Sequence, residues 1–222
     1  MYKILFIDEE ADAIDDFKDY VEQTPASKNV QVLSEFPLND LDEMVALIIK
    51  INPDAVITDF MLNEHKTHIK YGVPYNGIEL VRHFTAIREA FPCFVMTSFD
   101  DDAVKQSDDV NIVYIKDILH SENKTNVKAN FLEKVVSQIT HYKARIESAE
   151  KELITLIKLR DEGKAGIMDE ERIIQLDNFL ERSIDKRNII PNDYKTLSNT
   201  QRLEQILNTV DDILEKVKKH ES

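Results

Sequence analysis

Residues 54–61 of the chain read DAVITDFM. The short run from Ala55 to Thr58 is typical of a strand that is covered on both faces. Because a carboxylate is not tolerated inside such a run, Asp59 is expected just beyond the strand's end, where open α/β sheets bind ligands. This stretch alone is equally consistent with a purely structural role, in which Asp59 caps the next element or starts a turn.

Other short apolar runs lie on both sides of this stretch, at residues 2–7, 30–33, 94–97 and 110–115. Apolar residues at helical spacing lie between them, over residues 13–21 and 42–51 and from residue 77 onward. Strands that alternate with helices indicate an α/β fold with a doubly wound, five-stranded parallel sheet.

Polar side chains follow most of these predicted strands. Asp8 and Glu9 follow the first, Asp59 the third, Thr97 ends the fourth, and Lys116 follows the fifth. Three acidic groups at one sheet edge repel one another, and a divalent cation such as Mg²⁺ would remove that conflict. A lysine and a hydroxyl beside them can hold phosphate oxygens. The set therefore indicates a carboxylate that accepts a phosphoryl group with metal assistance.

Five motifs in this order resemble the receiver domain of two-component response regulators. They are FIDEE, VITDFML, YNGIELV, FVMTS and YIKD, and they cover residues 2 to about 140. The resemblance implies a flavodoxin-like receiver fold, Mg²⁺ as cofactor and a histidine kinase as phosphodonor.

The resemblance also implies a role for each matching residue. Asp59 would be the phosphoacceptor, Thr97 the switch hydroxyl and Lys116 the cation that pairs with phosphate. Asp8, Glu9 and Asp59 would form the metal pocket, completed by the backbone carbonyl of Met61. The alternatives are that Asp8 is a helix N-cap, Thr97 a simple strand-end hydroxyl and Lys116 a solvated strand terminus.

Three features depart from the family pattern. The loop over residues 60–76 is longer than usual and carries His65 and His68, which are expected to belong to an exposed basic loop. Asp117 replaces the proline that follows the lysine, so a trans peptide bond is expected there. The aromatic residue is Tyr114 instead of the family's position at Val113, and strand alternation points these two side chains to opposite faces.

The C-terminal part has a different pattern. Residues 141–222 are predicted to be a helical output or interaction region, continuous with the last helix of a receiver domain at residues 1–140. One heptad seam, with apolar residues at steps of three and four, runs through Ile139, Tyr142, Ile146, Ala149, Leu153 and Leu156. Another occupies residues 203–217. Glycines 163 and 166 break the first helix. The seams are consistent with a helical bundle that packs on itself, with a homodimer, or with binding to a partner helix.

Composition excludes several function classes. The net charge is −14, and residues 145–222 hold 14 Lys and Arg against 17 Asp and Glu, which does not favour nucleic acid. No apolar run has the length of a membrane span, and no secretion leader is seen, so a cytoplasmic protein is expected. Nothing in the helical region indicates an enzyme. The sequence predicts a response regulator; the alternatives are a phosphate sink or relay protein, or a receiver-like scaffold that works without phosphorylation.

Overall fold

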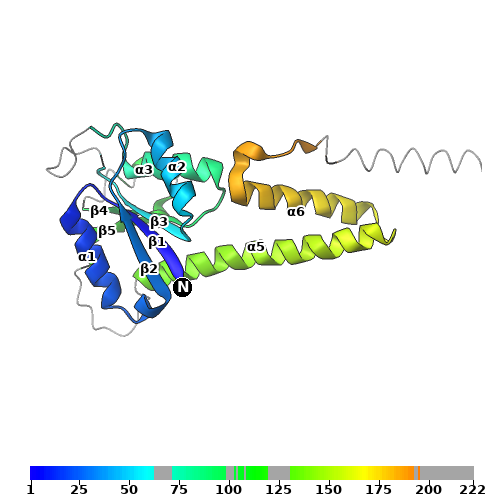
Figure 1. The fold of residues 1–222 in the computed structure, drawn as a ribbon, viewed down its shortest axis with the longest axis horizontal. Helices are drawn as coiled ribbons and strands as arrows, with labels where there is room; N and C mark the ends of the chain where they lie inside the picture. Colours follow the sequence, from blue (N-terminus) through cyan, green and yellow to red (C-terminus); the bar gives the residue numbers. More distant parts are fainter. Residues whose placement is uncertain are drawn as a thin grey trace, which may run out of the picture. The chain divides into compact units, whose positions relative to one another are not determined.

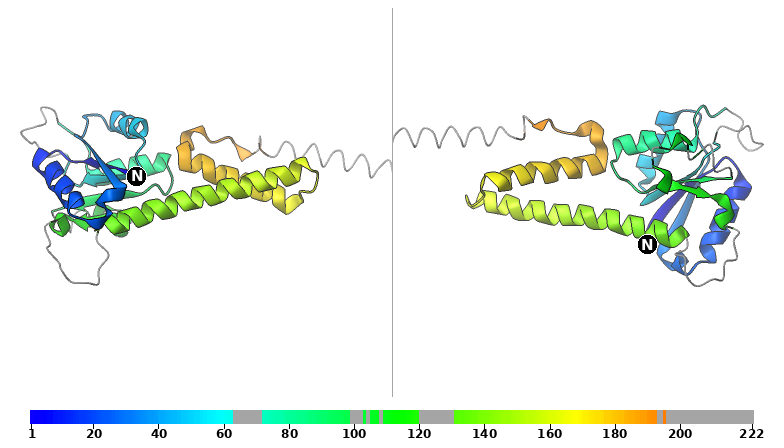
Figure 2. Two further views of the ribbon diagram at one scale, coloured as in Figure 1. Left: turned by 60° about the horizontal axis from the view of Figure 1, so that its bottom comes forward. Right: turned by 180° about the vertical axis from the view of Figure 1, so that it is seen from behind.

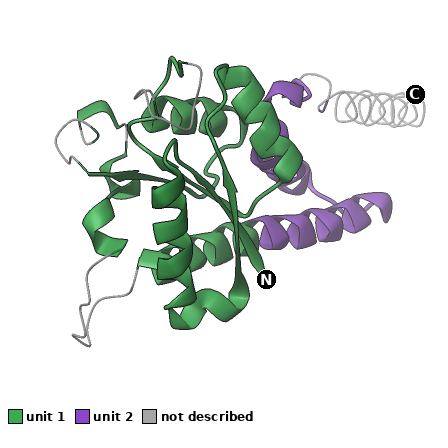
Figure 3. Cartoon of the chain, turned by 60° about the vertical axis from the view of Figure 1, so that its left-hand side comes forward, with its two compact units in different colours: residues 1–145 green, residues 146–222 purple. Residues whose placement is uncertain are grey.

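The computed structural model describes residues 1–62, 72–98, 103, 105–107, 109–119, 131–192 and 195. The chain divides into two compact units, residues 1–145 and residues 146–222 (Figure 3). The helix α5 (Phe131–Asp161) crosses this boundary without interruption. Among the described helices, none is long and apolar enough to cross a membrane.

The first unit is built on a five-stranded sheet in which all neighbouring strands are parallel. The order is β2-β1-β3-β4-β5, which is the flavodoxin-like order of doubly wound sheets. The predicted fold class is therefore confirmed. The strands are β1 (Tyr2–Ile7), β2 (Val30–Glu35), β3 (Ala55–Asp59), β4 (Cys93–Thr97) and β5 (Val113–Ile115).

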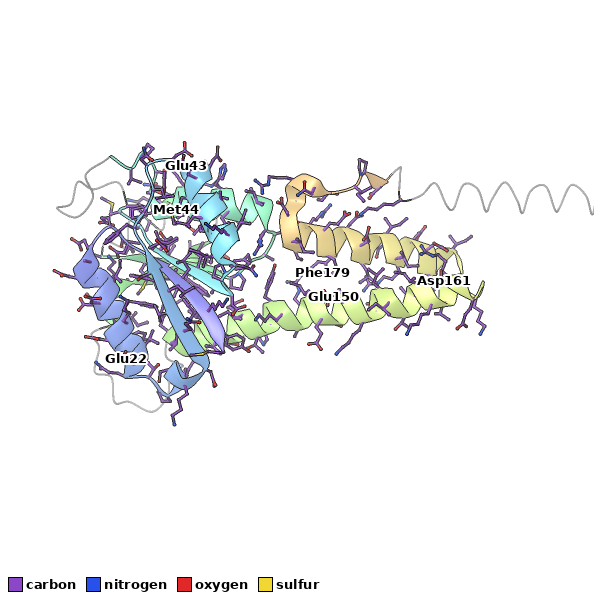
Figure 4. The ribbon with its side chains drawn as sticks, in the orientation of Figure 1. Glu22, Glu43, Met44, Glu150, Asp161 and Phe179 are labelled. Carbon is purple, nitrogen blue, oxygen red and sulfur yellow. The ribbon has the colours of Figure 1, made fainter. Side chains whose placement is uncertain are left out.

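Helices cover both faces of this sheet (Figures 1 and 2). One apolar core joins the sheet to α2 (Leu41–Ile51) and α3 (Gly77–Ile87) and includes the fully buried Met44 (Figure 4). The other core joins it to α1 (Ala11–Glu22) and the beginning of α5. Burial on both faces explains why the residues of β3 and β4 read as continuous apolar runs.

The strand predicted over residues 110–115 is shorter in the structure. Val110–Ile112 forms a 3-10 turn, η2, and only Val113–Ile115 joins the sheet. The cause is local, because the Asp109 side chain accepts a hydrogen bond from the Asn111 N–H at 2.9 Å. A side chain that caps a turn in this way competes with strand pairing. Two more 3-10 segments occur at Pro25–Asn29 (η1) and Lys116–Leu119 (η3).

The described part of the second unit is a helical hairpin of α5 and α6 (Ile167–Asp185), followed by the turn η4 (Lys186–Asn188). The predicted break is present: α5 ends at Asp161, and Gly163 adopts a left-handed φ of 70°. Ala149 of α5 and Leu176 of α6 are buried, while Leu153 and Leu156 are half-buried.

A bidentate ion pair ties the two helices together. Arg172 of α6 donates to both carboxylate oxygens of Glu152 of α5, at 2.7 and 2.9 Å. The second predicted seam (203–217), most of the predicted long loop with His65 and His68, and Phe99 lie outside the described residues.

Candidate functional site

The carboxyl ends of four strands bring the predicted polar residues to one edge of the sheet. Asp59 ends β3, Thr97 ends β4, and Lys116 comes directly after β5. Asp8 and Glu9 follow β1, which pairs with β3 such that Ile7 lies opposite Thr58. The strand order reverses between β1 and β3, and in doubly wound sheets ligands bind at that switch point.

Lys116 connects two of the three acids. Its Nζ lies 2.7 Å from Asp59 Oδ1 and 3.0 Å from Asp8 Oδ2. The lysine side chain is 18 % exposed, so it is not the solvated strand terminus of the alternative. Burial by itself lowers the pKa of Lys116, but the charges of Asp59 and Asp8 outweigh it, and the net pKa is raised. The ammonium group is therefore held in its charged form.

Backbone donors hold both aspartates in place. The N–H of Met61 donates to Asp59 Oδ2 at 2.6 Å, and the N–H of Glu10 donates to Asp8 Oδ1 at 2.9 Å. Glu10, not Asp8, occupies the N-cap position of α1. Asp8 therefore points into the cluster, and burial raises its pKa against the opposing pull of Lys116. These contacts bring Met61 to the site through its N–H.

Glu9 is the third acid of the cluster. Its Oε2 is buried and, among the described residues, has no hydrogen-bond partner. Burial, followed by the charges of Asp59 and Asp8, raises the pKa of Glu9 to about 8. One carboxylate oxygen from each of Asp8, Glu9 and Asp59 lies within 4.8 Å of the others. A buried, unpaired oxygen beside two further carboxylates fits a small divalent cation that takes oxygen ligands.

Gly77 fixes the position of the strand end that carries Asp59. A Cβ atom at Gly77 would lie 2.0 Å from the carbonyl oxygen of Asp59, inside van der Waals contact. The Gly77 N–H also donates to the Phe60 carbonyl at 2.9 Å. A capping box between Asn76 and Glu79 holds this end of α3 in place. The start of α3 is thus packed directly on the backbone of Asp59.

The features beside Lys116 agree with two sequence expectations. The peptide bond between Lys116 and Asp117 is trans, as are all peptide bonds among the described residues. Val113 packs with the α2–α3 core and Tyr114 with the α1–α5 core, so the two side chains point to opposite faces as predicted. Thr97 is buried at the end of β4 beside this strand.

Two residues were not assigned a site role from the sequence. Gly77 stands within the YNGIELV motif, and the scarcity of glycine, four in 222 residues, is the signal that could have marked it. The second residue is Tyr114, whose ring centroid lies 4.7 Å from that of Phe131. Because Tyr114 and Phe131 belong to separate elements, their spacing along the chain could not predict this contact.

No protein-family model and no curated protein sequence matches the chain. Solved structures with similar folds include an anti-anti-sigma factor, PhyR from Bartonella quintana, at 15 % identity and a TM-score of 0.42. That match covers 67 % of this chain and 51 % of PhyR, so this chain spans about half of PhyR's length.

Two other solved structures carry receiver or response-regulator names. The signal receiver domain of NarL from Mycobacterium tuberculosis matches at 15 % identity over 63 % of this chain and 96 % of its own, with a TM-score of 0.39. RcsB from Salmonella enterica serovar Typhimurium, bound to promoter DNA, matches at 15 % identity over 89 % of this chain and 100 % of its own, with a TM-score of 0.38. All three TM-scores lie below 0.5, so the fold assignment stands on the sheet order itself.

Proposed function

We propose that this protein is a response regulator whose receiver domain, residues 1–140, accepts a phosphoryl group on Asp59. The observation that carries the proposal is the position of Lys116, whose Nζ bridges Asp59 and Asp8 beside a Glu9 oxygen that has no hydrogen-bond partner among the described residues. A nucleophilic carboxylate, a fixed cation and a metal-binding pocket at one sheet edge are the parts that phosphoryl transfer needs.

The transfer can be written with its atoms balanced. A carboxylate oxygen of Asp59 attacks the phosphorus of a phosphohistidine on a histidine kinase. The phosphorus–nitrogen bond breaks as the acyl phosphate forms, and the leaving imidazole nitrogen regains its electron pair. Lys116 Nζ, which already lies 2.7 Å from Asp59, pairs with a phosphoryl oxygen, and the Thr97 hydroxyl donates to another.

Asp8, Glu9 and Asp59 would hold Mg²⁺, with the Met61 carbonyl as a further ligand. When bound, the ion supplies positive charge that offsets the developing charge on the phosphoryl oxygens. The chain's own contribution is to orient Asp59, through the Met61 N–H and the packing of Gly77, before the donor arrives.

The output is assigned to the helical region, residues 141–222, acting on a protein partner or through a homodimer. The half-buried seam of the α5–α6 hairpin supports this role, since Leu153 and Leu156 keep apolar surface that another helix could cover. The acidic balance of the chain argues against an output that binds duplex DNA. The proposal gives the helical region no enzymatic activity of its own. A phosphate sink, a phosphorelay protein and a phosphorylation-independent scaffold are the competing functions.

Labelling with acetyl phosphate and Mg²⁺ tests the proposal. The wild-type protein should gain one acid-stable, base-labile phosphoryl group, and Asp59→Asn should gain none. Asp54→Asn is the matched control, because Asp54 lies next to the other end of β3 and pairs with Lys143. Labelling of Asp59→Asn would place the acceptor elsewhere. A partner or dimer that responds to labelling separates a regulator from a sink, and an unlabelled wild-type protein would favour the scaffold.

A further inference from the structure

The aromatic residue of β5 faces a different neighbour from the one that the family pattern provides. Tyr114 is directed to the α1–α5 core, where its ring lies 4.7 Å from that of Phe131 and 6.1 Å from that of Phe94. Phe131 and Phe94 are themselves in edge contact at 5.9 Å. We define these three residues as the aromatic cluster.

The aromatic cluster connects β5, the strand that precedes Lys116, with the beginning of α5. Tyr114 stands two residues before Lys116 on a strand of three residues. Phe131 is the first residue of α5 and is fully buried. We propose that Tyr114 couples the state of Asp59 to α5 through Phe131, an inference that rests on the proposed function of Asp59.

The physical basis is the change of partner at Lys116. In the structure its ammonium group is shared between Asp8 and Asp59. A phosphoryl group on Asp59 adds negative charge beyond the carboxylate, so the ammonium group gains a new partner and moves toward it. Lys116 is covalently continuous with β5, and β5 lies at the sheet edge, pairing with β4 through only three residues. A short edge strand can follow this movement at little cost.

The movement reaches α5 through the contact of Tyr114 with Phe131. Tyr114 is half-buried, and its ring lies against the fully buried Phe131 ring, so a shift of β5 changes the packing at the beginning of α5. The Leu132 N–H, one residue on, donates to the Tyr20 hydroxyl of α1 at 3.4 Å, so the first turn of α5 has a second contact that can change. From Phe131 to Asp161 the helix is uninterrupted, and it carries a displacement of its first turn along its length.

Hydrogen exchange with and without acetyl phosphate and Mg²⁺ tests this coupling on the full chain. Labelling should change the exchange rates of amides 135–145 by about tenfold, a usual size for coupling between two sites. Tyr114→Leu should reduce that change to less than about twofold while Asp59 is still labelled. Tyr114→Phe keeps the ring and should keep the response. Val113→Ala, on the opposite face, is the matched control and should also keep it.

If Tyr114→Leu fails to fold, Tyr114→Met takes its place, since methionine is apolar, similar in size to leucine and also lacks the ring. It should lose the response in the same way. A full exchange response in Tyr114→Leu or Tyr114→Met overturns the coupling. A labelled wild-type protein with unchanged exchange in α5 also overturns it, and leaves the proposed function intact. Absence of any label on Asp59 defeats the proposed function itself.

Discussion

Replacing Gly77 by Ala places a methyl group 2.0 Å from the carbonyl oxygen of Asp59. Real Cβ atoms essentially never approach closer than 3.0 Å, so the backbone of Asp59 or the start of α3 has to move by 1.0 Å or more. A displacement of that size at a reacting group costs about 100-fold in rate. We therefore expect Gly77→Ala to accept phosphate from acetyl phosphate about 100-fold more slowly.

The assay compares initial labelling rates and thermal melts of the variant and of Gly166→Ala. Gly166 is a suitable control, because a Cβ there would meet its nearest atom at an ordinary 3.7 Å. Alanine is the better helix former by about 1 kcal/mol, so helix propensity alone would stabilise α3 in the variant. Labelling of Gly77→Ala within about twofold of the wild-type rate would refute the reasoning, even if the melting temperature fell.

Other predictions concern the helical region, the acidic cluster around Glu9, the lifetime of the phosphate and the binding of nucleic acid. Leu153→Asp puts a charge into the half-buried α5–α6 seam and should cost about 1–3 kcal/mol or break a dimer, as melts and light scattering would show; Ser148→Asp, exposed on α5, should do neither. The Mg²⁺-free protein should lose stability as pH rises from about 4.5 to about 8, since folded Glu9 keeps a proton that the unfolded chain has released. Denaturant melts of Glu9→Gln should lack this dependence. In the receiver family that the sequence resembles, the residues two positions after the phosphoacceptor and two positions after the switch threonine flank the path of the attacking water. Here they are Met61 and Phe99, which are apolar and cannot orient a water, so phosphate release should be slow. Release should accelerate in the double variant Met61→Asn with Phe99→Glu, and an unchanged rate would mean that water access at these positions is not limiting. Gel shifts should show no sequence-specific duplex binding at physiological salt, and sub-micromolar binding would contradict this.

The sheet was predictable because a strand that is buried on both faces has a continuous apolar sequence. Ala55–Asp59 and Cys93–Thr97 are buried at every position, and each reads as an unbroken run that ends in a polar residue. The carboxyl ends of parallel strands share one edge, so the order of the runs was enough to bring Asp8, Asp59 and Lys116 together.

The features that could not be predicted depend on distances between elements. The order of residues does not predict that Lys116 bridges two aspartates, or that the Glu9 Oε2 has no hydrogen-bond partner within the described part of the chain. The contact between Gly77 and the Asp59 carbonyl, and that between Tyr114 and Phe131, arise from how helices pack on the sheet. The predicted start of β5 was wrong for a local reason, because the Asp109 cap begins a turn at Val110–Ile112, where the apolar pattern still favours a strand.

The charge arrangement of the pocket links metal binding to proton release. In the part of the chain that the structure describes, Lys116 contacts Asp8 and Asp59, and the Glu9 Oε2 has no hydrogen-bond partner. With a pKa of about 8, Glu9 keeps its proton near neutral pH, which removes one of the three negative charges from the buried cluster. A divalent cation binds the ionised form, so its binding must displace that proton. On the proposed function, we therefore expect the affinity for Mg²⁺, and with it the rate at which Asp59 is labelled by acetyl phosphate, to rise with pH up to about 8.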